Sequence, residues 1–315
     1  MITTNYIEEA EIVIVGGGIG GLATALALHK KGLESVINLV GAQLRPRAVP
    51  FTALRNISLN NDKQEEIPLR EEARCLKRND LVQVLADSLP PNTVRFGCHI
   101  LAVKLDPLTS QPILQLQDGN TIKAKVVIGC DGVHSVVSEL IGLKPAKSFS
   151  TCGVRGFTSY PSGHGLSNEF IRIRKDNRLF GRMPVDDNLL YWFVARPWTS
   201  SDEGVSSEPK LIKESTIESI TGFPAELIEI VKKCDLDSLT LTRIRYRTPW
   251  DILLGNFRKG TVIVAGDAMH VMGPFLGQGG SAALEDAVVL ARNLAQAMSM
   301  KGSKRMDEKN YAGKD

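Results

Sequence analysis

One stretch near the beginning of the chain restricts the possible folds more than any other: EIVIVGGGIGGLATALALHKKG, residues 11–32. Residues 12–15 are uniformly apolar, which is typical of a strand buried on both faces. Gly16, Gly18 and Gly21 follow at once, and apolar residues from Leu22 onward recur at helical spacing. The stretch therefore predicts a strand, a tight glycine turn and a helix, the opening of an α/β domain with a parallel sheet.

The three glycines have the spacing G-x-G-x-x-G, which has a physical meaning at a strand-to-helix junction. Gly16 permits the tight turn, Gly18 lets a pyrophosphate approach the backbone, and Gly21 lets the helix pack on the strand. The start of the helix adds free N–H donors and the positive end of its dipole. We expect a dinucleotide to bind here.

The same fold usually places an acid about 20 residues further on, at the end of the second strand, to bind a ribose hydroxyl. The predicted second strand, SVINLV at residues 35–40, ends without an acid. Asn38 could offer a neutral hydrogen bond, or the ribose contact could be absent. Both alternatives stay open at the level of sequence.

A second segment, VVIGCDGVHSVV at residues 126–137, predicts another strand that ends in Cys130, Asp131 and Gly132. Simple turn chemistry is one explanation for an Asp-Gly pair at a strand end. A contact with the bound cofactor is the other.

The third segment is GDAMHVMGPFLGQGG at residues 266–280, between the apolar run TVIVA and the amphipathic pattern of a helix over residues 281–298. Asp267 stands at a strand end, where a carboxylate can accept hydrogen bonds from sugar hydroxyls. Pro274 stiffens the turn, and the glycines after it expose N–H groups that stabilise negative charge. His270 has no evident partner in the sequence, and we expect a structural role for it.

The middle of the chain has a different pattern. Residues 148–239 predict mainly strands, including two joined by a turn at residues 186–188, and two helices at 209–219 and 224–233. A further helix is predicted at 79–89, and a hairpin at Asp118-Gly119 follows it in the chain. This order predicts a discontinuous nucleotide-binding domain, residues 1–147 with 240–315, interrupted by an inserted domain at 148–239.

Composition excludes several classes of protein. The chain has 38 basic and 35 acidic residues, so no excess of positive charge indicates a nucleic-acid partner. Five scattered cysteines and five dispersed histidines match no metal-ligand spacing, and we expect free thiols and no bound metal. Neither a targeting segment nor a membrane span is evident, which predicts a cytoplasmic protein. The arginines of TRIRYR, Arg243, Arg245 and Arg247, are expected on the polar face of a strand, with a cofactor or substrate contact as the alternative.

Taken together, the three segments resemble the three fingerprints of single-component FAD-dependent monooxygenases of the aromatic-hydroxylase type. The last segment is most similar to the plant branch, related to salicylate hydroxylases and zeaxanthin epoxidase. The resemblance covers nearly the whole chain and implies a shortened form. It implies a Rossmann-like FAD-binding domain of the glutathione-reductase type with an inserted, mainly antiparallel substrate domain. Ser138 stands where the second fingerprint commonly has an arginine.

The resemblance also implies roles for individual residues. Asp131 would lie near FAD and the path of NAD(P)H, Asp267 would bind ribityl or ribose hydroxyls, and Pro274 would sit beside the flavin ring. One of two arginines before the 79–89 helix would reach the FAD phosphate or ribose. The implied cofactor-binding residues are Gly16, Gly18, Gly21, Arg74, Arg78, Asp131, Gly266, Asp267, Pro274, Gly277, Gln278, Gly279 and Gly280.

The implied activity is an NAD(P)H-using monooxygenase that hydroxylates or epoxidises a small aromatic or isoprenoid compound with O2 through a flavin hydroperoxide. Because the cofactor supplies the difficult chemistry, no catalytic side chain is expected. The alternative is a non-catalytic or regulatory FAD-binding relative with an incomplete flavin pocket. Aromatic residues of the inserted domain could face a substrate, but at strand spacing they are more often core: Tyr160, Phe170, Phe180, Tyr191, Trp192 and Phe193.

Overall fold

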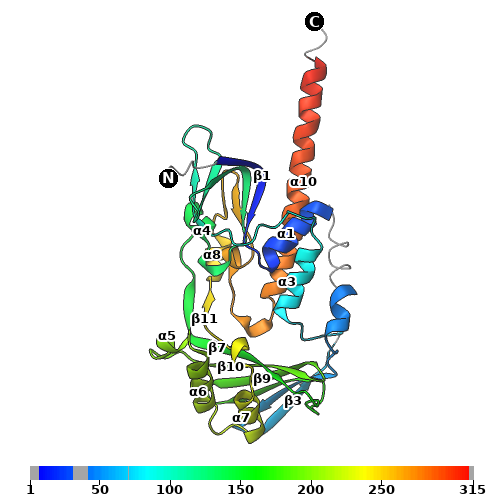
Figure 1. Cartoon of the computed structure of the whole chain (residues 1–315), viewed down its shortest axis with the longest axis vertical. Helices are drawn as coiled ribbons and strands as arrows, with labels where there is room; N and C mark the ends of the chain where they lie inside the picture. The colour runs from blue at the N-terminus through cyan, green and yellow to red at the C-terminus, as the bar shows by residue number, and fades with distance from the viewer. Residues whose placement is uncertain (1–6, 31–41, 70, 312–315) are drawn as a thin grey trace. The chain divides into compact units, whose positions relative to one another are not determined.

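The structure is a computed structural model that describes residues 7–30, 42–69 and 71–311, with side chains up to residue 297 (Figure 1). The chain forms two compact units. The first unit comprises Met1–Gly41, Leu81–Lys147 and Arg245–Asp315, and the second unit comprises Ala42–Asp80 and Ser148–Ile244.

The first unit is built on a six-stranded sheet. Its central strand, β6, is long enough to pair with β1 along one side and with β5 and β13 along the other. β1 and β13 both run parallel to β6, whereas β5 runs antiparallel to it. The strands are β1 (Ile7–Val15), β4 (Ile100–Leu105), β5 (Pro112–Leu116), β6 (Thr121–Gly129), β12 (Arg258–Lys259) and β13 (Val262–Val264).

Helices pack beside this sheet. α1 lies against α10, as Figure 1 shows, and the buried face of α10 in this region is made of small alanines. The 3-10 turn η2 (Gly132–His134) leads from β6 into α4, and η4 (Pro274–Leu276) precedes α10. The helices are α1 (Ile19–Lys30), α3 (Arg78–Asp87), which continues into the second unit, α4 (Val136–Ile141), α8 (Pro249–Leu253), α9 (Asp267–His270) and α10 (Gly279–Tyr311).

The second unit is built on a seven-stranded sheet in the order β11-β7-β10-β9-β8-β2-β3. β10 is antiparallel to β7 and β9, β9 to β8, and β2 to β3, while β2 runs parallel to β8. The strands are β2 (Ala53–Ser58), β3 (Lys63–Ile67), β7 (Lys147–Ser159), β8 (Glu169–Lys175), β9 (Arg178–Asp186), β10 (Leu189–Pro197) and β11 (Thr240–Tyr246).

One face of the second sheet carries the core of its unit. β10 alternates buried Leu190, Trp192 and Val194 with half-buried Tyr191 and Phe193, as expected for a strand with two different faces. The buried set packs against the short helix α5 (Asp202–Val205) and against α6 (Pro209–Ser219) and α7 (Ala225–Lys232), which Figure 1 shows on one side of the sheet.

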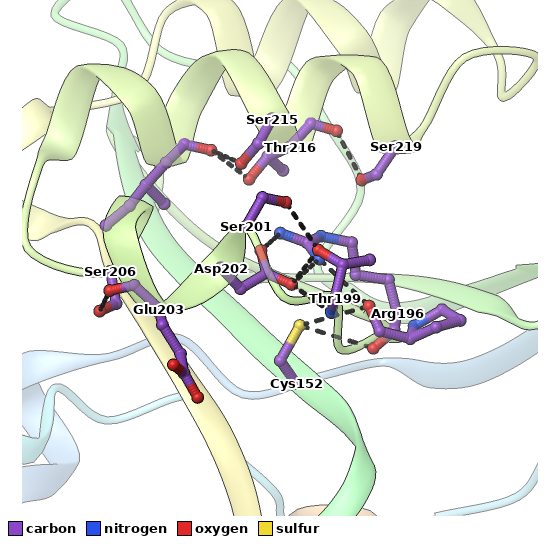
Figure 2. Close-up of polar contacts among 12 residues, drawn as sticks. Cys152, Arg196, Thr199, Ser201, Asp202, Glu203, Ser206, Ser215, Thr216 and Ser219 are labelled. Atoms are coloured by element: carbon purple, nitrogen blue, oxygen red, sulfur yellow. Dashed lines mark hydrogen bonds and ion pairs between the residues drawn. The ribbon is translucent and has the colours of Figure 1, made fainter.

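A buried ion pair joins the end of β10 to α5 (Figure 2). The guanidinium of Arg196 binds both carboxylate oxygens of Asp202, at 2.9 and 2.6 Å, and the two residues are only 5% and 2% exposed. The backbone and hydroxyl of Thr199 also donate to Asp202, at 2.7 and 2.9 Å. The bidentate pair and the two further donors to Asp202 offset much of the cost of removing both charges from water, although Nε of Arg196 is buried without a partner among the described residues.

Most predicted elements are confirmed. The first strand and helix, the Asp118-Gly119 hairpin between β5 and β6, the turn at residues 186–188 and the helices α3, α6, α7 and α10 all form. The predicted second strand, residues 35–40, lies outside the described residues.

The segment 42–80 departs from the predicted domain division. It contributes β2 and β3, and β2 pairs with β8, so the segment belongs to the second unit rather than to the nucleotide-binding domain. Pro46, Pro50 and Pro68 flank these strands, and β3 is a polar edge strand, KQEEI, without the apolar alternation that reveals a strand in a sequence.

Candidate functional site

Three neighbouring parallel strands of the first unit end at the same level. Val15 of β1 and Val264 of β13 are both in register with Gly129 of β6. Parallel strands have their carboxyl ends at one edge of the sheet. The turns of the three sequence segments, which follow these strand ends, therefore begin side by side there. In open α/β sheets this edge is where ligands bind.

The glycine turn after β1 is tight for a measurable reason. Gly16 has φ +114°, and a Cβ atom placed on it would lie 2.3 Å from the carbonyl oxygen of Cys130. A Cβ atom on Gly21 would lie 1.9 Å from the carbonyl oxygen of Gly16. The carbonyl of Gly18 accepts the N–H of Leu22 at 3.0 Å, and helix α1 continues from this point. Side chains would therefore separate the first and second segments.

Asp131 follows β6 in the second segment, and its two carboxylate oxygens differ in their hydrogen bonding. Its Oδ2 atom accepts the N–H of Val136 at 2.8 Å, at the start of α4. Its Oδ1 atom is buried and has no hydrogen-bond partner among the described residues. Gly132 takes φ +81°, and Ser135 caps α4 by accepting the N–H of Ser138 at 2.9 Å. The turn therefore accounts for the hydrogen bond of Oδ2, whereas the unpartnered Oδ1 leaves an acceptor that a ligand could use.

The third segment forms two short turns before α10. Gly266 takes φ +61°, and the exposed Asp267 follows it as the first residue of α9. Pro274 starts η4, and Gly277 ends it with φ +66°. The backbone carbonyl oxygen of Gln278 accepts the N–H of Ala282 at 2.9 Å. The backbone N–H groups of the residues between them therefore have no partner within the helix. α10 starts at Gly279, with Gly280 next, two residues before the predicted start.

The two candidate arginines differ in their surroundings in the second unit. Nη1 of Arg74 donates to the carbonyl oxygens of Arg45, at 2.9 Å, and Ala48, and its Nε atom donates to Glu72 at 3.0 Å. This guanidinium is therefore engaged by its own unit. Arg78 is exposed at the start of α3. A cofactor contact by Arg78 stays a prediction.

The sequence missed the partner of His270. Nε2 of His270 lies 2.6 Å from Oδ2 of Asp286, on α10, and the same oxygen accepts the N–H of Gly266 at 2.7 Å. The hydrogen bond to Asp286 raises the pKa of His270. Burial alone raises the pKa of Asp286, but the bonds from His270 and Gly266 outweigh it and lower that pKa. The signal in the sequence is an acid beside the apolar stripe of an amphipathic helix.

A second contact holds the third segment from another side. The hydroxyl of Ser138 donates to the carbonyl oxygen of Ala268 at 3.1 Å, and Nη2 of Arg247 donates to the same oxygen at 3.2 Å. Nη1 of Arg247 donates to the carbonyl oxygen of Lys144. The prediction that all three TRIRYR arginines lie on a polar strand face is wrong for Arg247, which is 9% exposed and follows the end of β11.

The arrangement fits a dinucleotide. Apart from chain neighbours, no heavy atom of the described residues lies within 4 Å of the point where a Cβ would stand on Gly17 or Gly279, so backbone faces open space at two helix starts. Buried Oδ1 of Asp131 supplies an acceptor that no described residue uses. N–H donors suit phosphate, and carboxylate oxygens suit sugar hydroxyls. Within the described residues, no group of three His, Cys, Asp or Glu side chains could hold a metal ion.

The family profile of the FAD binding domain matches residues 70–310, more than half of the 315-residue chain. The chain belongs to this family, the FAD-dependent monooxygenases, and FAD is its cofactor. No helix in the described part of the chain is both long and apolar enough to cross a bilayer.

Individual relatives agree with this class. The chain is 47% identical to Monooxygenase 1 of Arabidopsis thaliana, over 92% of this chain and 79% of the relative, and 35% identical to Monooxygenase 2 of the same plant, over 95% and 80%. The fold resembles that of Klebsiella pneumoniae HpxO, solved with FAD and uric acid, with a TM-score of 0.74 at 19% identity, over 90% of this chain and 79% of HpxO. These matches confirm the predicted family and its α/β fold.

Proposed function

We propose that this monooxygenase uses NAD(P)H and O2 to hydroxylate or epoxidise a small aromatic or isoprenoid compound. The observation that carries the proposal is the meeting of three glycine- and acid-containing segments at the ends of β1, β6 and β13. Among the relatives are proteins named urate hydroxylase and zeaxanthin epoxidase, which act on chemically different compounds. Their names support the reaction class rather than one substrate.

The protein's own part is to bind and orient the cofactor. The backbone at Gly16, Gly18 and Gly21 would receive the pyrophosphate, because no side chain stands between it and the N–H groups of α1. Oδ1 of Asp131 and the carboxylate of Asp267 would accept hydrogen bonds from hydroxyl groups. When bound, the flavin supplies the redox chemistry that activates dioxygen, so the protein needs no nucleophile of its own.

The N–H groups that precede the first intrahelical bond of α10 have a separate role in the proposal. They point out of a helix start, where the dipole favours negative charge. Gly277, Gly279 and Gly280 keep side chains away from them, and Pro274 fixes the turn before them. A ring edge that becomes anionic on reduction would be stabilised here without any ionisable group.

The second unit offers a surface suited to a flat, apolar substrate. On the sheet face opposite the core, Phe157, Tyr191, Phe193 and Phe170 form a row with ring centroids 5.3, 6.3 and 6.4 Å apart. Phe193 lies over the backbone of Gly181, where a Cβ atom would stand 2.2 Å from the ring. The aromatic residues therefore divide, because Phe180 and Trp192 stack in the core on the other face. A row of rings favours an aromatic or isoprenoid ligand.

Turnover by the purified protein tests the proposal. With FAD bound, candidate aromatic and isoprenoid compounds are added with NADPH or NADH, and oxidation of the reductant and incorporation of isotope-labelled dioxygen are measured. We expect one compound class to accelerate oxidation and to gain one oxygen atom. Asp267→Ala should lose FAD and activity, and Asp187→Ala, an exposed turn residue, should keep both.

The same experiment separates the alternative function. A non-catalytic FAD-binding relative would bind the flavin and show no substrate-stimulated oxidation of NADH or NADPH. The engagement of Arg74 by backbone carbonyls is the observation that favours this alternative, because it occupies Nη1 of one of the two arginines of which one is proposed to reach FAD.

A further inference from the structure

Helix α10 carries an acid where its neighbours are buried alanines. Ala283, Ala287 and Ala291 are 8%, 0% and 6% exposed and recur every four residues, and Asp286 lies one residue before Ala287. The side chain of Asp286 is 23% exposed and faces the third segment. A carboxylate in this position is stable only if other groups bind it.

Two groups of the third segment meet one oxygen of Asp286. The N–H of Gly266 donates to Oδ2 at 2.7 Å, and Nε2 of His270 lies 2.6 Å from it. Gly266 has φ +61° and ψ −143°, a region that is essentially limited to glycine. Such a backbone persists only when its surroundings hold it. Asp286 therefore binds both ends of the five-residue turn, residues 266–270, that contains Asp267.

The turn has no other side-chain cap among the described contacts. The N-cap residue of α9 is Gly266, which has no side chain to cap the turn. Asp286, which lies on α10, accepts the N–H of Gly266 and so acts as the cap instead. The contacts of Ser138 and Arg247 reach the middle of the turn, at Ala268. Of these three side chains in the described structure, Asp286 is the one that bonds to Gly266, the residue directly before Asp267.

We infer that Asp286 and His270 are positioning residues, which hold the carboxylate of Asp267 where the cofactor's hydroxyl groups can reach it. The inference rests on the proposed function, because it assigns the two residues to the FAD site. Neither residue is expected to touch the reacting atoms. Their effect should appear as FAD affinity rather than as loss of the fold.

The charge state of the pair gives the inference a pH dependence. The hydrogen bond to Asp286 raises the pKa of His270, and the imidazole Nδ1 atom is buried without a partner in the described structure. Burial raises the pKa of Cys130 to about 12, so this nearby thiol stays neutral. The other charged or titratable groups on the described parts of the elements packed there are Asp267, Asp131, His134, Glu139 and Arg247, with Glu285 and Arg292 on α10 and His29 and Lys30 on α1.

The sign follows from the raised pKa of His270. The ion pair is complete below the ordinary histidine pKa of about 6.5, and it is lost as pH rises through the higher value in the folded protein. FAD should therefore bind more weakly as pH rises through the raised pKa of His270.

Measured FAD dissociation constants for four proteins test the inference. Wild type is compared with Asp286→Asn, His270→Gln and the matched control Glu285→Gln, an exposed neighbour on α10, between pH 6 and 9 by quenching of flavin fluorescence. We expect the first two variants to weaken binding by about tenfold at pH 6, a change of 1.4 kcal/mol, and to lose the pH dependence. Glu285→Gln should match wild type in both.

Amide exchange in the protein without FAD provides an independent readout. Asp286→Asn should speed exchange at residues 266–270, whereas Glu285→Gln should not. If FAD fails to bind wild type, the proposed function is wrong and exchange alone decides the inference. Unchanged exchange, or unchanged affinity with an unchanged pH profile, overturns it. If Asp286→Asn does not fold, His270→Gln carries the same comparison.

Discussion

At the scale of single residues, the candidate site depends on places where no side chain can stand. Gly16 and Gly21 lie so close to backbone carbonyl groups that a methyl group would collide with them. Gly266 and Gly277 take positive φ angles at the turns of the third segment. Carboxylates at Asp131 and Asp267 then provide acceptors beside the bare backbone. The glycines therefore determine the shape of the site, and the acids determine its hydrogen bonding.

Substitution of Gly16 should be far more damaging than substitution of its neighbour. Gly16→Ala introduces a Cβ atom 2.3 Å from the carbonyl oxygen of Cys130, at a φ angle that alone costs about 1–3 kcal/mol. Gly17→Ala places its methyl group in open space. Urea denaturation should show a large loss of stability for the first variant and almost none for the second. Equal stability would contradict the described turn.

The ion pair of Arg196 and Asp202 is a structural feature of the second unit. Asp202→Ala leaves the guanidinium buried without a counter-charge and should destabilise the protein by about 3–5 kcal/mol. Lys232→Ala breaks the exposed pair with Glu229 and should change stability by less than about 1 kcal/mol. The two unfolding free energies provide the comparison, and similar values would mean that the buried pair is unimportant.

At the scale of elements, the sequence predicts those whose local pattern is strong. β1, the glycine turn and α1 form as expected, because a run of apolar residues followed by spaced glycines has few alternatives. β3 was not predicted, because its polar residues carry no alternation and its position depends on β2 and β8. The local apolar pattern of a sequence predicts a strand or helix. It does not show which strands pair when the partners lie far apart in the chain.

The same limit explains which site residues were missed. Asp286 meets His270 across 16 residues, and Arg247 meets the carbonyl of Ala268 across 21 residues, through turns whose geometry no spacing rule contains. The acid beside the alanine stripe of α10 indicated a buried partner but not its identity. Predicted contacts of the glycines with a cofactor stay predictions, since they concern a group that comes from outside the chain.

The two donors to Ala268 join α9 to α4 and to the end of β11, and they should act together. Ser138→Ala and Arg247→Met each leave the carbonyl oxygen of Ala268 with one donor, but the double variant leaves it with neither of the two. An unsatisfied buried group costs about 1–3 kcal/mol. A double-mutant cycle by urea denaturation should therefore give a coupling energy of at least about 0.5 kcal/mol. Additive effects would contradict a shared acceptor.

At the scale of the whole molecule, two units divide the tasks of the proposed reaction. The first unit brings three chain segments to one sheet edge, and the second unit presents a row of aromatic rings on one sheet face. The chain belongs to the FAD-dependent monooxygenases. In the proposed function the sheet edge binds the cofactor and the aromatic row binds the substrate. Both features are properties of the fold rather than of single catalytic groups, as expected when a cofactor carries the chemistry.

Binding should also be visible as stability. A ligand that binds only the folded chain stabilises it by about 2.7 kcal/mol at a free concentration 100 times its dissociation constant. FAD should therefore raise the melting temperature of wild type and leave that of Asp267→Ala nearly unchanged at the same concentration. A rise of equal size in both proteins would show that Asp267 contributes nothing to binding.

The most direct test of the central claim, that the ends of β1, β6 and β13 hold FAD, is calorimetric titration of the protein with FAD. The account predicts one FAD per chain, an absorbance spectrum of bound flavin, and loss of binding in Gly18→Asp, which places a negative charge where the pyrophosphate is proposed to bind, with no loss in Glu285→Gln. Saturable binding that Gly18→Asp leaves intact would contradict the claim.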